Sequence, residues 1–204
     1  MSSSRSNTDT ISIYDEKTQA ILRSAQEGER AALEALFERV GPALLSWVHL
    51  RMSAAFRQRV DPRDAVQEVW LRAMQRIAAL DPRTTPFRAW IFRIAHFVLI
   101  EMSRNLVRTR GSASQDGSSF LASRPDSETG VSVRFAREDA VQVFLDRVGG
   151  LKREHRELVV LRGLEGCSFD EIAKRLGGNA PTWEKRWKRL RTRIGSEVAP
   201  DYLL

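Results

Sequence analysis

Apolar side chains recur at three- and four-residue intervals along most of this chain, which is the spacing of amphipathic helices. One such stripe consists of Leu33, Leu36, Phe37 and Val40. A later stripe consists of Phe87, Trp90, Ile91, Ile94 and Val98. No segment shows the strict alternation of apolar and polar residues that predicts a strand. The pattern therefore predicts an all-α fold.

A single change of composition divides the helical pattern in two. Residues 108–133 are rich in Ser and Gly and have no apolar periodicity, a composition typical of flexible linkers. We expect one helical module over residues 18–107 and a second over residues 134–196. Residues 1–17 are expected to be a disordered tail and residues 197–204 a second, short tail.

Two proline-containing pairs in the first module predict helix boundaries. Gly41-Pro42 is expected to interrupt the first long helical stretch, because proline lacks the backbone N–H that an inner turn needs. Asp61-Pro62 is a favourable helix start, with proline at the first helical position. We therefore expect a helix over about residues 62–79.

The balance of charge favours one class of partner. The 204 residues include 33 Lys and Arg against 26 Asp and Glu, a formal net charge of +7. Such a balance favours a polyanion, above all nucleic acid. Cys167 is the single cysteine, which excludes an internal disulfide and a cysteine-rich metal site. The N-terminus does not look like a signal peptide and no apolar run is long enough to cross a membrane, so we expect a cytoplasmic protein without membrane insertion.

Residues 168–194 have the organisation of a helix-turn-helix. Ser168, with Glu171 three residues later, forms a capping-box sequence at the start of the first helix. The run Gly-Gly-Asn at 177–179 predicts a tight turn, since glycine tolerates positive φ. A second helix should begin near Ala180. In a helix-turn-helix, this second helix is the one that enters the DNA major groove.

The second of these helices carries two kinds of side chain on different faces. Its apolar residues share one helical face: Trp183, Trp187, Leu190 and Ile194. We interpret this face as core, with base stacking by Trp183 as the alternative. The cations must then project from the remaining faces, where Glu184 is the nearby acid. Dense positive charge on the second helix of a helix-turn-helix favours contact with DNA.

The helix expected over residues 62–79 has an apolar face and a mixed face. The apolar face consists of Val66, Val69, Trp70, Ala73 and Ile77. The mixed face consists of Asp64, Gln67, Glu68, Leu71 and Gln75. Such a mixed stripe fits a solvated surface and also fits a docking surface for another protein. The pattern alone leaves both interpretations open.

The helix that follows is basic and aromatic. Its cations include Arg88, Arg93, Arg104 and Arg108. Its rings are Phe87, Trp90, Phe92 and Phe97, most of which are expected in the core. Cations beside aromatic rings also suit single-stranded nucleic acid, where bases stack and phosphates pair with charge. The pattern leaves this function open.

Together these segments resemble a bacterial RNA polymerase sigma factor of the extracytoplasmic-function (ECF) group. DPRDAVQEVWLRAMQRI resembles the polymerase-binding segment of sigma domain two, and FRAWIFRIAHFVLI resembles the segment that melts and reads the −10 promoter element. LKREHRELVVLRGLEGCSFDEIAKRLG and the basic helix after it resemble sigma domain four, which binds the −35 element. The resemblance implies a dissociable polymerase subunit that does no covalent chemistry and uses no metal or cofactor.

The resemblance also implies a role for each matching residue. The residues implied to contact the clamp of the largest polymerase subunit are Asp64, Gln67, Glu68 and Leu71. Those implied to contact the −10 element are Arg83, Thr84 and Thr85, in the loop that captures a flipped base, and Arg88, Arg93 and His96. Those implied to contact the −35 element are Lys185, Lys188 and Arg189, facing bases, and Thr182 and Arg186, nearer the phosphates. Further implied partners are the flap of the second-largest subunit and an anti-sigma factor.

This chain departs from the family pattern at a few positions. His96-Phe97 replaces a common Arg-Asn pair, and Glu101 replaces a common Asp. The second helix of the helix-turn-helix opens with PTWEK, which places Glu184 at a commonly basic position. These changes concern which promoter sequences are read rather than membership of the family.

Two other functions compete with this one. A helix-turn-helix regulator that acts on duplex DNA without polymerase would explain the second module, but it leaves the mixed face and the long linker unused. An enzyme is disfavoured because His49, His96 and His155 share no metal-ligand spacing. The sequence also has neither a phosphate-cradling glycine loop nor a nucleophile elbow.

Overall fold

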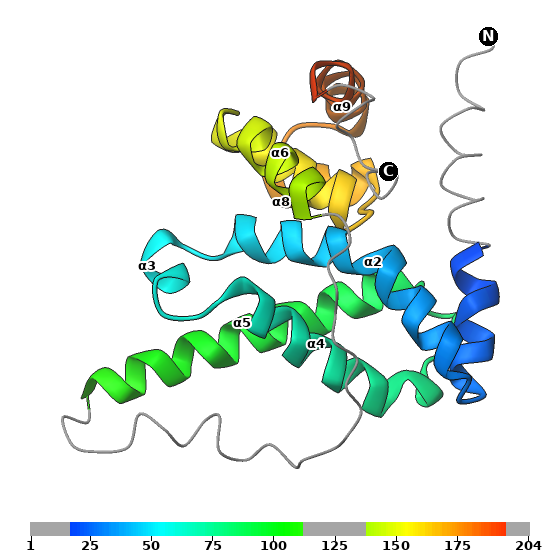
Figure 1. The fold of residues 1–204 in the computed structure, drawn as a ribbon. Coiled ribbons are helices and arrows are strands. Elements are labelled where there is room, and N and C mark those ends of the chain that lie inside the picture. The colour runs from blue at the N-terminus through cyan, green and yellow to red at the C-terminus, as the bar shows by residue number, and fades with distance from the viewer. Residues whose placement is uncertain (1–16, 112–137, 195–204) are drawn as a thin grey trace, which may run out of the picture.

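The computed structural model describes residues 17–111 and 138–194, which are arranged as helices joined by turns (Figure 1). These residues include no strand, and the predicted all-α fold is confirmed. Residues 1–16, 112–137 and 195–204 lie outside the described part, so most of the two tails and of the linker predicted from the sequence falls there. Among the described residues, no helix is long and apolar enough to span a membrane.

The N-terminal module is built around three long helices. A first helix over residues 17–26 precedes α2 (Arg30–Arg51), and the short α3 (Ala54–Arg57) leads to α4 (Pro62–Arg76), the 3₁₀ turn η1 (Ile77–Ala79) and α5 (Phe87–Gly111). Helix α4 packs on both α2 and α5. At one such contact the ring of Phe37 meets Trp70 edge to face, with centroids 5.0 Å apart. The apolar stripes read from the sequence are the buried faces of these helices.

Helix α2 runs without a break through Pro42, so the interruption predicted at Gly41-Pro42 was wrong. Every residue from 41 to 48 is buried, and this burial offsets the backbone hydrogen bond that proline cannot donate. Gly41 also has a packing role, because a Cβ atom there would lie 3.1 Å from the ring of Phe37. Tertiary packing therefore outweighs the local preference of these two residues.

The start of α4 agrees with the sequence prediction, whereas α5 continues further than expected. Asp61 caps α4 by accepting a hydrogen bond from the backbone N–H of Arg63 at 2.8 Å, and Pro62 occupies the first turn. Helix α5 extends to Gly111, so residues 108–111, assigned from the sequence to the linker, are helical. The Ser- and Gly-rich composition begins only at Gly111, and the residues before it favour a helix.

The C-terminal module contains α6 (Glu138–Gly149), α7 (Arg153–Leu158), the π-helix η2 (Val159–Leu164), α8 (Phe169–Leu176) and α9 (Ala180–Ile194). The predicted capping box is present: the Ser168 hydroxyl accepts from the backbone N–H of Glu171 at 3.2 Å, and the Glu171 carboxylate accepts from the backbone N–H of Ser168 at 2.8 Å. Gly177 and Gly178 both have φ of +81°, a conformation that favours glycine. The helix-turn-helix is therefore confirmed.

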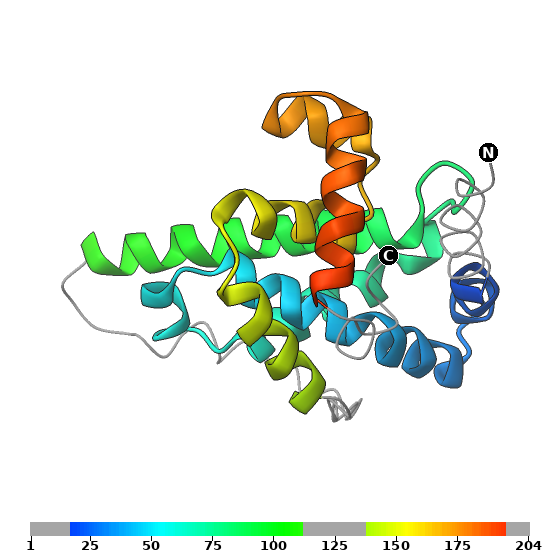
Figure 2. The ribbon, with the colours of Figure 1, turned by 90° about the horizontal axis from the view of Figure 1, so that it is seen from above.

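The two modules pack against one another. Helix α6 and η2 both contact α2, and Figure 1 shows the C-terminal module resting on this side of the N-terminal one. Seen from above, its helices lie across α2 and α5 (Figure 2). Residues more than 100 positions apart in the sequence are hydrogen-bonded across this contact, among them Trp47 with Glu165 and Arg51 with Glu157.

Candidate polymerase and nucleic-acid interfaces

The mixed face of α4 is directed away from the core. Val66, Val69 and Ala73 are buried on the opposite side of the helix. Asp64 is exposed, Gln67 and Glu68 are half-buried, and Leu71 is 39% exposed. The four residues predicted to contact polymerase thus share one accessible helix face.

Glu68 is held by a charged cluster that ties α4 to α5. Arg72 donates to Glu68 at 2.6 Å and to Glu101 at 2.7 Å. The hydrogen bond to Glu101 is the main cause that raises the pKa of Arg72, and the same bond lowers the pKa of Glu101. Arg72 balances the charge of Glu68, which leaves Asp64 as the more available anion on this face.

The loop between η1 and α5 is fixed by Asp81. Its carboxylate accepts from the backbone N–H of Arg83 at 2.9 Å, and its carbonyl accepts from the Thr84 hydroxyl at 3.0 Å and from the Thr85 N–H at 3.1 Å. The side chains of Arg83 and Thr84 are exposed and Thr85 is half-buried. This turn presents a basic and two hydroxyl side chains from a fixed backbone.

The −10 residues predicted on α5 divide into two groups. Arg93 is exposed to solvent. Arg88 instead donates to the backbone carbonyls of Gly163 and Leu164, and Nε2 of His96 lies 3.6 Å from Oε1 of Glu165. Two of the six residues predicted to contact the −10 element therefore face the C-terminal module. No local pattern indicates these contacts, because the partners are about 70 residues away in the sequence.

An exposed apolar stripe on α5 was not predicted from the sequence. Phe97 is 64% exposed and Ile100 and Val107 are also exposed, with Arg104 and Arg108 beside them. Most of the aromatic rings of α5 are buried or partly buried, as expected, and Phe97 is the exception. The position of Phe97 along the helix could have identified it, because Phe97 does not lie on the face that Ile91, Ile94 and Val98 share.

Helix α9 is divided by face as the sequence predicted. Trp183, Trp187, Leu190 and Ile194 are buried, and the indole N–H of Trp183 donates to the carbonyl of Gly177 at 2.8 Å. These contacts confirm the core interpretation of both rings over base stacking.

The residues predicted to contact the −35 element lie outside this buried face. Thr182, Lys185, Lys188 and Arg189 are exposed. Arg186 is half-buried, because it stacks over the ring of Trp183 at 4.8 Å and pairs with Glu154 at 2.7 Å. It is therefore less available to a phosphate than the sequence suggested, whereas the three predicted base-facing cations project from the helix-turn-helix.

Other kinds of site find little support in the described part of the chain. Within residues 17–111 and 138–194, no group of three or more His, Cys, Asp or Glu side chains could hold a metal ion. Burial is the main cause that raises the pKa of the Cys167 thiol to about 11. Since the thiolate is the reactive form of cysteine, Cys167 is a poor nucleophile.

Comparisons with known proteins match the chain over nearly its full length. The family model described as ECF sigma factor matches residues 15–199. The chain is 24% identical over 195 residues to the ECF RNA polymerase sigma factor SigD of Mycobacterium tuberculosis, covering 95% of this chain and 90% of SigD. It is 29% identical over 161 residues to SigL of the same species, covering 78% and 84%. Among solved structures, CnrH in complex with the cytosolic domain of CnrY matches with 23% identity and a TM-score of 0.42, over 88% of this chain and 95% of CnrH.

The family match includes both modules and the segment between them. It spans the mixed face of α4, the loop after η1, the basic helix α5 and the helix-turn-helix. A regulator that shared only the helix-turn-helix would not produce a match that begins at residue 15. The chain belongs to the ECF sigma factor family.

Proposed function

We propose that this protein is a dissociable subunit of bacterial RNA polymerase that brings the core enzyme to promoters through contacts with both the −10 and the −35 elements. The observation that supports this most directly is that one chain presents two separate accessible surfaces. One is the mixed acidic and apolar face of α4, and the other is the row of cations on α9. A DNA-binding regulator needs only the second surface.

The polymerase contact is assigned to the face of α4. Asp64 and Leu71 are its most accessible members, with Gln67 between them and Glu68 positioned by Arg72. Their partner is the clamp of the largest subunit. The flap of the second-largest subunit is assigned to the C-terminal module, and an anti-sigma factor is a further partner that we propose on family grounds alone.

The two promoter contacts are assigned to different modules. Arg83, Thr84 and Thr85 would receive an unstacked base of the −10 element, and Arg93 would meet the melted strand. Lys185, Lys188 and Arg189 would enter the major groove at the −35 element, where Lys and Arg pair well with guanine. Each side chain is accessible enough to make the assigned contact.

Run-off transcription with core polymerase tests the proposal. The wild-type chain should direct core polymerase to discrete start sites on genomic fragments, and Asp64→Arg with Leu71→Asp should abolish both transcription and co-purification with core. Glu38→Arg is the matched control, since Glu38 is exposed on α2 and its reversal makes the same charge change as Asp64→Arg away from α4. All three proteins should have similar melting temperatures, because exposed positions contribute little to stability.

Two results would reject the proposal. The first is tight, sequence-specific binding of promoter duplex by the free protein together with no effect of core polymerase, which would favour the regulator. The second is an α4 double variant that still assembles a transcribing complex, which would place the polymerase contact elsewhere.

A further inference from the structure

Helix α9 contains a single acid, Glu184, among its cations. The Glu184 side chain is exposed, as are those of Lys185, which follows it, and Lys188, one helical turn further on. A carboxylate on a helix that faces DNA is repelled by the phosphates and lowers the affinity for every sequence. An acid at this position therefore calls for a compensating partner, either in the protein or in the DNA.

The protein itself supplies no hydrogen-bonding partner for this carboxylate. Lys188 lies four residues after Glu184, a spacing that suits an ion pair on a helix surface. Among the residues that the structure describes, however, Glu184 forms no ion pair and accepts no side-chain hydrogen bond. Its carboxylate oxygens are directed to solvent from the exposed surface of the helix-turn-helix.

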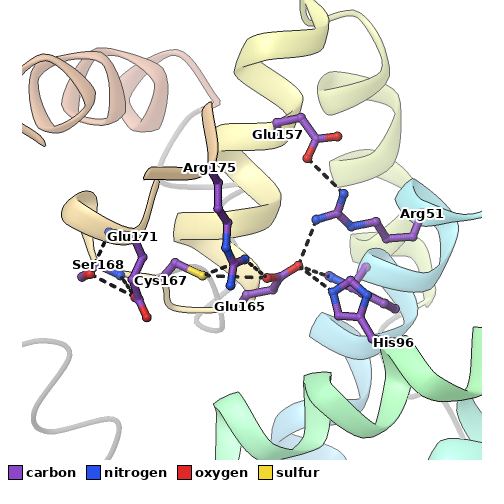
Figure 3. Close-up of polar contacts among 9 residues, drawn as sticks. Arg51, His96, Glu157, Glu165, Cys167, Ser168, Glu171 and Arg175 are labelled. Carbon is purple, nitrogen blue, oxygen red and sulfur yellow. Dashed lines mark hydrogen bonds and ion pairs between the residues drawn. The ribbon is translucent and has the colours of Figure 1, made fainter. Parts of the chain in front are cut away.

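Other glutamates of the C-terminal module are held by partners (Figure 3). Arg51 pairs with both Glu157 and Glu165, at 3.0 Å in each case. Glu171 accepts from the backbone N–H of Ser168 at 2.8 Å. The contrast shows that acids in this module are commonly satisfied within the protein, and that the acid of α9 is not.

The buried side chain of Arg162 acts on Glu184 through its charge alone. Its guanidinium donates to the carbonyl of Cys167 at 3.1 Å and lies over the ring of Phe169 at 4.7 Å. Burial is the main cause that lowers the pKa of Arg162, and the charge of Glu184 partly offsets it. This attraction helps the helix to tolerate an acid, but it leaves the carboxylate oxygens of Glu184 available as hydrogen-bond acceptors.

The backbone that carries Glu184 is fixed on both sides. The side-chain oxygen of Asn179 accepts from the backbone N–H of Thr182 at 3.0 Å, which caps the start of α9. Trp183 and Trp187, which flank Glu184, are both buried. In a helix-turn-helix, the N-terminal residues of the second helix contact the base edges. The carboxylate is thus presented from a rigid turn at the end of the helix where bases are read.

We propose that Glu184 reads a cytosine of the −35 element by accepting a hydrogen bond from the N4 amino group in the major groove. The proposal rests on the function proposed above and adds a base preference to it. In this groove cytosine presents a donor, whereas guanine presents the acceptors N7 and O6 and thymine presents the acceptor O4. Adenine presents its N6 donor beside the acceptor N7, which repels a carboxylate. Cytosine is therefore the base that best suits this side chain.

The acid and the neighbouring cations then make complementary contributions to recognition. Lys185 and Lys188 are attracted to phosphates of any sequence and pair with the acceptors of guanine. Glu184 opposes binding wherever its carboxylate meets an acceptor instead of an amino group. Discrimination between DNA sequences often depends on such a repulsive element.

Substitution of Glu184 tests this assignment. The templates are copies of a promoter mapped by run-off transcription, with each of the four bases in turn at every position of the −35 element. The full-length proteins are the wild type, Glu184→Gln and Glu184→Ala, each with core polymerase. Asp170→Asn is the matched control, because it also neutralises an exposed acid, on the neighbouring helix α8. Transcript yield from each template and the melting temperature of each protein are measured.

The wild type should transcribe about tenfold more from templates with cytosine at one −35 position than from those with another base there. Glu184→Gln should move the preference at this position to adenine, because an amide pairs with both N6 and N7 of that base. Glu184→Ala should lose the preference at this position and keep the others. Asp170→Asn should show the same base preferences as the wild type.

Two outcomes overturn the cytosine contact. In the first, the wild type and both Glu184 variants share one profile of base preferences, and a lowered melting temperature of the variants would then make Glu184 only a counter-charge for Arg162. In the second, the preference that the variants lose is for a base other than cytosine. Failure of the proposed function is distinguishable, because the wild type would then transcribe from no template with core polymerase, and the cytosine contact would be rejected with it.

Discussion

At the scale of single residues, Glu165 shows how local environment sets protonation. Burial alone would raise the pKa of its carboxyl, but hydrogen bonds from His96, Trp47 and Arg51, together with the charge of Arg51, outweigh burial and lower the pKa to about 2. The ordinary value is 4.5. A group whose pKa is lower in the folded state stabilises that state above the unfolded pKa, and this stabilisation is lost as the pH falls through the folded pKa.

We therefore expect the stability that Glu165 contributes to be constant from pH 8 to about pH 5 and to decline as the pH falls from about 4.5 toward 2. The measurement is the difference in melting temperature between the wild type and Glu165→Gln across this range. The other ionisable groups facing Glu165 are Arg51, Arg175, Cys167 and His96. The same comparison in a His96→Gln background shows how much of the difference depends on the contact between His96 and Glu165. If the difference in melting temperature between the wild type and Glu165→Gln stays constant down to pH 2.5, the lowered pKa of Glu165 does not account for it.

Phe97 provides a second test at this scale. Because its ring is 64% exposed, Phe97→Ala should change stability by no more than about 0.5 kcal/mol. If the ring stacks on a base of the melted strand, promoter opening should weaken by about 1–3 kcal/mol. Permanganate footprinting of the opened promoter, with Val107→Ala as the control on the same stripe, measures this. Equal footprints for wild type and Phe97→Ala would remove the ring from the DNA contact.

At the scale of elements, the sequence predicted the helices whose signals are local. Asp61-Pro62 begins α4, the Ser168–Glu171 pair caps α8, and the turn 177–179 precedes α9. Two features that the sequence did not predict have a common cause. The continuity of α2 through Pro42 depends on packing by distant residues, and the occupation of Arg88 by the carbonyls of η2 depends on a contact 75 residues away. No local pattern contains this information.

Substitutions on the buried face of α9 should change stability, and substitutions on its exposed face should change DNA recognition. Trp187 is 2% exposed, so Trp187→Ala should cost about 3–5 kcal/mol of stability. Lys185→Ala and Arg189→Ala should leave the melting temperature unchanged, and each should weaken −35-dependent transcription by about 1–3 kcal/mol with relaxed preference at one or two bases. Thermal melts and transcription from a promoter library measure the two effects. A fully folded Trp187→Ala protein that has lost only base preference would instead make this ring a DNA contact.

At the scale of the whole molecule, the modules are linked by contacts that the sequence did not predict. The composition of residues 108–133 predicted two tethered modules, and a tether alone would leave their separation free. In the structure, α2 and α5 hold the C-terminal module through Trp47, Arg51 and Arg88. The family match covers both modules, whereas the side chains that join them lie far apart in the sequence and could be identified only from coordinates.

This arrangement predicts the order of events when core polymerase binds. Because the docking face on α4 is accessible while the modules are in contact, the first encounter should be bimolecular. It should be equally fast in the wild type and in Arg51→Glu, which reverses the charge that pairs with Glu157 and Glu165. Separation of the two modules should follow as a step whose rate does not depend on polymerase concentration. Dyes on introduced cysteines at Glu38 and Asp170, exposed positions in the two modules, would report the separation by energy transfer in a stopped-flow experiment. Cys167 would interfere little, because its buried thiol has a pKa of about 11.

The wild type should show a fast phase whose rate increases with polymerase concentration and a slower phase whose rate does not. Arg51→Glu should lose the slower phase. A wild-type signal with one phase, proportional to polymerase at every concentration, would mean that the free protein is already open.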